Sequence, residues 1–91
     1  MKLEQDDKGD VVVAPAMLAQ RLSIPEAALR RLMQDGQVTS VVEVGEGEDA
    51  GRRRLSVRCG DTVWRAVVDA GLTVLEEETF DLRFRRWRSA G

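Results

Sequence analysis

Residues 38–59 decide the fold of this chain and read VTSVVEVGEGEDAGRRRLSVRC. Apolar and polar side chains alternate at both ends of this stretch. Valines recur through 38–44, and Leu55 and Val57 alternate with arginines through 52–59. An alternation of period two is typical of a half-buried β-strand. Three glycines and three acidic residues separate the two runs. The stretch therefore predicts two antiparallel strands joined by an acidic loop, with arginines on the outer face of the second strand.

Further strands are predicted after this hairpin. Gly60-Asp61 and Ala70-Gly71 are turn signals, and they delimit predicted strands at 63–68 and 72–76. Phe80, Leu82 and Phe84 alternate with charged residues, so residues 79–91 are expected to form an edge strand or an arm that wraps a second subunit. Together these segments predict an antiparallel β-meander.

Residues 1–37 predict a short hairpin and two helices. Strands are expected at 2–5 and 10–14, followed by helices at 15–22 and 25–35. Ser23 and Glu26 match the capping box that starts a helix, and Leu29, Leu32 and Met33 form an apolar stripe on the second helix. We therefore expect an α+β fold in one domain, 1–91, whose helices cover the sheet face that holds Leu55, Val57 and Cys59.

The composition excludes several classes of function. The chain has no histidine and one cysteine, which excludes histidine acid–base catalysis, histidine-ligated metals and an internal disulfide. Its glycine loop matches neither a phosphate-binding loop nor a dinucleotide fingerprint. Cys59 is expected to be a small buried hydrophobe. We therefore expect that the chain is not an enzyme and binds no cofactor.

The net charge of −2 conceals an uneven distribution. Residues 1–50 carry 5 basic and 10 acidic side chains, a net of −5, whereas residues 51–91 carry 9 and 6, a net of +3. This polarity predicts a homodimer held partly by charge complementarity between subunits, or a contact with another protein. The chain lacks a signal peptide and any apolar run of about 18 residues, which favours a cytoplasmic protein without membrane contact.

Two segments supply the predicted interaction residues. The loop could pair with its own arginines, contact a protein or gather a hard cation such as calcium, since carboxylates suit such ions. The arginine-aromatic tail could be a dimer arm, a nucleic-acid contact or a solvated end. The candidates are Glu46, Glu48, Asp49, Arg52, Arg53, Arg54, Arg83, Arg85, Arg86 and Trp87.

The helix pair also resembles a helix-turn-helix. Ala19 would allow close helix approach, and the following hairpin resembles the wing of excisionase and mercury-resistance-regulator domains. The resemblance implies a second helix that reads the major groove through Glu26, Arg30, Arg31 and Gln34. The acidic loop would repel phosphate, and the chain is anionic overall, so nucleic acid is the alternative and a non-enzymatic binding or assembly module is the favoured interpretation.

A second resemblance covers nearly the whole chain. Its most specific part is the string Gly-Glu-Gly-Glu-Asp-Ala-Gly-Arg at 45–52, supported by the opening 1–13, by Met33-Gln34-Asp35-Gly36 and by 67–74. These residues resemble a family of small bacterial proteins catalogued as a domain of unknown function. The resemblance implies size and fold, and it implies no chemistry.

Overall fold

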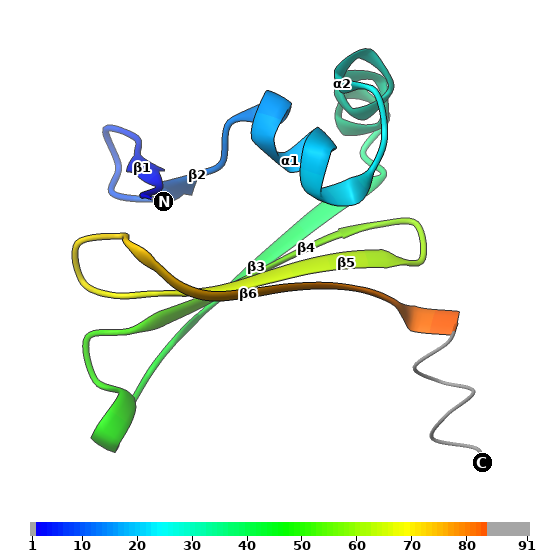
Figure 1. Cartoon of the computed structure of the whole chain (residues 1–91). Helices are drawn as coiled ribbons and strands as arrows, with labels where there is room; N and C mark the ends of the chain where they lie inside the picture. The colour runs from blue at the N-terminus through cyan, green and yellow to red at the C-terminus, as the bar shows by residue number, and fades with distance from the viewer. Residues whose placement is uncertain (1, 84–91) are drawn as a thin grey trace.

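The computed structural model describes residues 2–83 and confirms the predicted α+β fold. A short N-terminal hairpin precedes two helices, and an antiparallel sheet follows them (Figure 1). The elements are β1 (Glu4–Gln5), β2 (Val11–Val12), α1 (Pro15–Leu22), α2 (Glu26–Gln34), β3 (Val38–Val44), the 3-10 turn η1 (Gly47–Asp49), β4 (Arg53–Cys59), β5 (Thr62–Val68) and β6 (Val74–Asp81). No helix within residues 2–83 is long and apolar enough to cross a membrane.

The four strands of the main sheet lie in the order β3-β4-β5-β6, so each strand pairs with its neighbour in sequence. Leu55 lies opposite Ala66, and Val57 lies opposite Trp64, so these side chains share one face of the sheet. The β1–β2 hairpin and both helices lie over that face, and no helix covers the opposite face in the part of the chain that is described (Figure 1). The sheet thus has one covered and one open face.

The core lies between α1 and the centre of the sheet. Trp64, Leu29 and Val68 are its largest fully buried side chains. Leu55 and Val57 are buried there, as predicted, while Cys59 is half-buried at the margin. α1 packs against β5, whereas α2 packs mainly on α1. This second-layer position explains why Met33 is exposed, although its spacing predicted a place in the apolar stripe.

The C-terminal part of the sheet differs from the prediction. One strand, β6, runs from Val74 to Asp81, whereas a strand at 72–76 and a separate edge strand or arm at 79–91 were expected. It passes through Glu76-Glu77-Glu78, and Phe84 lies outside the described residues. Tertiary ion pairs explain this: Glu77 pairs with Arg21 on α1, and Glu78 pairs with Arg65 on β5. The acidic run, where a break between two segments was expected, is therefore stabilised as part of one strand.

The predicted capping box at Ser23 and Glu26 is wrong. Ser23 instead closes α1 in the left-handed conformation, at φ 60°, and its backbone N–H donates to carbonyls of the last turn. Pro25 is the N-cap of α2, without a side-chain capping bond. Glu26 binds Arg30 of its own helix. The turn between the helices is too short for Ser23 to both end α1 and cap α2.

Candidate interaction surface

The sheet has two edge strands, and β3 is the unprotected one. Among the described residues β3 pairs only with β4, and every residue from Thr39 to Val44 is exposed. Val41, Val42 and Val44 are 57%, 45% and 71% exposed. Exposed, apolar edge strands are templates for pairing with another chain, which proteins usually prevent with lysine, proline or short strands. β3 has none of these devices.

The backbone N–H and C=O groups of successive β3 residues point alternately toward β4 and away from the sheet. The amide of Gly45 donates to the carbonyl of Arg52 at 2.9 Å, and these two residues directly continue the β3–β4 register. Hydrogen-bonded pairs alternate along an antiparallel ladder. The odd-numbered residues of β3 therefore bond to β4, and the even-numbered residues, Ser40 and Val42 among them, direct their N–H and C=O groups away from the sheet.

The other edge strand, β6, is protected by charge. It carries Glu76, Glu77 and Glu78 in sequence, and a β-bulge interrupts its pairing with β5 at Val67/Val68. Charged side chains and bulges both discourage edge-to-edge association. By contrast, Glu43 is the only charged residue of β3, and Arg54 binds it through two hydrogen bonds of 3.0 and 2.9 Å.

The structure brings four predicted interaction residues together at the C-terminal end of β3. Asp49 and three arginines line a shallow pocket of about 420 Å³: Arg52, Arg53 and Arg54. Asp49 pairs with Arg52 at 3.8 Å, so the loop is partly self-paired. Glu46 and Glu48 are exposed and do not line this pocket. Within residues 2–83, no group of three acidic or cysteine side chains is arranged to hold a metal ion.

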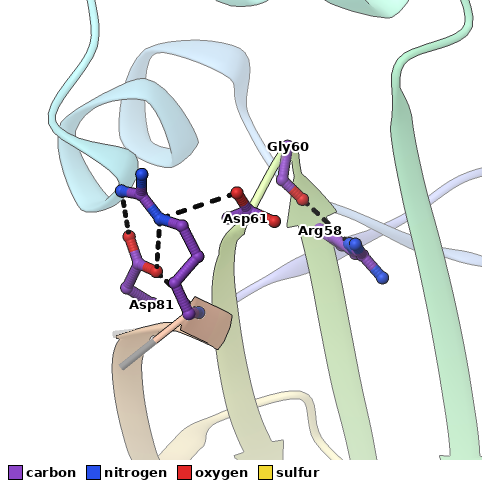
Figure 2. A network of polar contacts seen from close by, with 5 residues as sticks. Arg58, Gly60, Asp61 and Asp81 are labelled. Atoms are coloured by element: carbon purple, nitrogen blue, oxygen red, sulfur yellow. Dashed lines mark hydrogen bonds and ion pairs between the residues drawn. The ribbon is translucent and has the colours of Figure 1, made fainter. Parts of the chain in front are cut away.

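Arg83 lies at the opposite end of the sheet, beside the β4–β5 turn. Its guanidinium binds Asp81 at 3.0 and 3.2 Å and approaches Asp61 at 3.6 Å. These carboxylates raise the pKa of Arg83 further above its usual range. In Figure 2 Asp61 and Asp81 lie near each other, while Arg58 turns to the Gly60 carbonyl. The other tail candidates, Arg85, Arg86 and Trp87, lie outside the described residues.

The predicted DNA contacts lie on α2 and are all exposed. Arg30 pairs with Glu26 at 2.8 Å, and Arg31 and Gln34 lie nearby on the same helix. α2 leads into the start of β3, whereas the tip of the proposed wing follows the end of β3. The two ends of this strand of 7 residues are about 20 Å apart. Figure 1 shows α2 and the η1 loop at opposite ends of the molecule. Arg30 and Arg31 on α2 therefore lie at one end of β3, and Arg52, Arg53 and Arg54 of the wing hairpin lie at the other.

Sequence reasoning missed one polar group that organises the covered face. The carboxylate of Glu77 accepts hydrogen bonds from Arg21 at 2.5 Å and from the indole of Trp64 at 3.1 Å. These two donors, Arg21 first, hold the pKa of Glu77 below its usual range. Glu77 thereby links α1, β5 and β6. Trp64 lies opposite Thr79 in the sheet, and Glu77 is two residues before Thr79 on β6, so the side chains of Trp64 and Glu77 lie on the same face. Only the strand register reveals this proximity.

Sequence reasoning also missed β3 as a candidate surface. The sequence of this strand did indicate an apolar surface, because four valines surround a single charged residue, Glu43. Such a strand looks half-buried until the sheet order places it at an edge.

Comparison with known proteins gives a family without an assigned activity. The profile of the family described as "Family of unknown function (DUF6522)" matches residues 1–88. No curated protein matches this chain, and no solved structure matches it.

Proposed function

Because the chain belongs to the DUF6522 family, whose function is unknown, we propose a function from the geometry: a non-enzymatic assembly module that forms a homodimer through β3. The observation that carries the proposal is the exposed, valine-rich edge strand. Two such edges satisfy each other's outward N–H and C=O groups and remove valine side chains from water. A small domain has little core of its own, so this burial also stabilises the fold.

A second copy is the occupant that the charges favour. In an antiparallel pair of β3 strands, the only carboxylate from each copy is Glu43, and Arg54 of the same chain already neutralises it. The same pairing at β6 would bring two runs of three glutamates together, which repel each other. Self-association through β3 therefore involves little electrostatic opposition.

The proposal changes the role of the charged segments. Complementarity between an acidic and a basic half was expected to hold the subunits together, yet many of these charges pair within one chain. Among the described residues the intrachain pairs include Arg21–Glu77, Arg30–Glu26, Arg52–Asp49, Arg54–Glu43, Arg65–Glu78, Arg83–Asp61 and Arg83–Asp81. We therefore assign the main contact to the backbone and valines of β3.

Analytical ultracentrifugation of the full chain from low to high micromolar concentration tests the proposal. We expect wild-type protein to show a reversible monomer–dimer equilibrium, and Val42→Lys to shift it at least tenfold toward monomer. Leu75→Lys is the matched control, since Leu75 is 46% exposed on the other edge strand and Val42 is 45% exposed. Circular dichroism establishes that each variant is folded. A wild-type chain that stays monomeric, or equal weakening by both lysines, would refute the proposal.

A further inference from the structure

We infer that the two β3 strands pair antiparallel about a two-fold axis that passes between Val41 and its copy, which joins the two four-stranded sheets into one. This inference rests on the proposed homodimer and specifies its geometry. It follows from the outward backbone positions, from the length of β3 and from the side chains that each register brings together.

The backbone permits only some registers. The even-numbered residues of β3 direct their N–H and C=O groups outward, so hydrogen-bonded pairs across the new interface must join even-numbered residues. An axis at Val41 meets this condition, since it pairs Val38 with Val44 and Ser40 with Val42 of the other copy. Val41 then faces its own copy in a non-hydrogen-bonded pair.

The length of the strand selects among the permitted registers. β3 spans 7 residues, and Val41 is its central one. An axis at Val41 therefore pairs the whole strand and satisfies every outward N–H and C=O group. An axis at Ser40 or Val42 leaves two residues of each strand overhanging, so fewer outward groups find a partner. Unpaired backbone groups at a partly desolvated interface are costly.

The side chains agree with this register. On the open face Val41 meets Val41, and Glu43 lies opposite Thr39 of the other copy, beside its own partner Arg54. On the covered face Val42 lies opposite Ser40 of the other copy. An axis at Val42 would instead place Glu43 opposite Val41 of the other copy. This register separates the two copies of Val41 and desolvates the Glu43 carboxylate. The central register thus brings apolar groups together and avoids facing charges.

The axis also determines the shape of the dimer. A two-fold axis perpendicular to the sheet preserves its faces, so the helices of both copies lie on the same side. Val42 and Val44 currently line an open groove with Val11 and Leu55 on that side. In the dimer the two grooves become neighbours across the joined β3 strands.

Cysteine cross-linking tests the register. Non-hydrogen-bonded partners have Cα atoms about 4.5 Å apart, which suits a disulfide, whereas diagonal neighbours at roughly 7–8 Å do not. In a Cys59→Ala background, Val41→Cys should form a covalent dimer with diamide as oxidant, at least tenfold faster than Val42→Cys. Val41 and Val42 are both exposed, so both variants should fold, which circular dichroism verifies.

The possible results separate the register from the proposed function. Faster cross-linking of Val42→Cys would overturn the register and leave the β3 dimer intact. A wild-type dimer in ultracentrifugation that neither cysteine cross-links would overturn β3 as the interface. A monomeric wild-type chain would overturn the dimer and the register together. Preferential cross-linking of Val41→Cys, abolished by adding Val44→Lys, would support both.

Discussion

Replacement of Glu77 by alanine should destabilise the fold by about 2 kcal/mol. The change leaves the indole N–H of the fully buried Trp64 without its acceptor, and an unpaired buried donor costs about 1–3 kcal/mol. It also removes the pair with Arg21, whose side chain is 28% exposed against 31% for Glu77, so solvent limits that contribution to about 0.2–1 kcal/mol. Water can reach the shortened side chain and bind the indole N–H, which keeps the total loss of stability near about 2 kcal/mol, the middle of the range for an unpaired buried donor.

Urea denaturation followed by tryptophan fluorescence measures this loss, with Trp87→Phe as background so that Trp64 reports alone. In a chain of this size, about 2 kcal/mol corresponds to a melting temperature lower by roughly 8–16 °C. Glu77→Gln retains an acceptor for the indole and should lose about half as much. Glu76→Ala, a neighbouring glutamate on the opposite face, should stay within about 0.5 kcal/mol of wild type. Equal losses for Glu76→Ala and Glu77→Ala would refute the reasoning.

The contribution of Glu77 should depend on pH. Its pKa is lower in the folded chain than in the unfolded chain, because Arg21 and Trp64 donate to the ionised carboxylate. The stability that it contributes is therefore complete above the unfolded pKa and disappears as pH falls through the folded pKa. The stability difference between wild type and Glu77→Ala should stay constant from pH 7 to about 5 and shrink below about 4. A difference that grows in acid would contradict this assignment.

Three other substitutions have defined outcomes in the same denaturation assay. Ser23→Gly should stabilise the chain by up to about 1 kcal/mol, since the left-handed strain of about 1–2 kcal/mol that glycine relieves at Ser23 exceeds the chain entropy of about 0.5–1 kcal/mol that glycine adds; a loss would mean that Ser23 acts as a cap after all. Leu29→Ala should cost about 2–5 kcal/mol because Leu29 is fully buried, and a cost below 1 would place α2 outside the core. Asp69→Ala should cost about 1–2 kcal/mol, since its carboxylate accepts the Gly71 and Thr73 amides in the β5–β6 turn, and no change would show that the turn forms without it.

The sequence predicted most elements because local patterns specify them. The period-two runs around residues 38–59 became β3 and β4, and Pro15 begins α1 as expected. Prediction failed at two places. The expected break after Glu76 is absent because Arg21 and Arg65 provide countercharges to Glu77 and Glu78, and the expected cap at Ser23 is absent because the backbone of Ser23 closes α1. The first outcome depends on residues far away in the sequence, whereas the second is decided by the last turn of α1 itself.

The candidate surface was harder to predict than the fold. Charge patterns directed attention to the loop and the tail, since charged and aromatic residues are typical of contacts. The structure shows that several of the described charges are already paired. It also shows that a strand of valines lies at an edge, a property of sheet order rather than of composition. Residue type alone cannot distinguish a central strand from an unprotected edge.

Residue-resolved amide hydrogen exchange tests the central claim, association through the β3 edge, most directly. Thr39, Val41 and Glu43 bond to β4, so their amides should be protected at every concentration. The outward amides of Ser40 and Val42 should exchange rapidly in dilute solution and become protected as the concentration rises through the dimerisation range. Rapid exchange of Ser40 and Val42 in a concentrated solution that contains dimer would contradict the account.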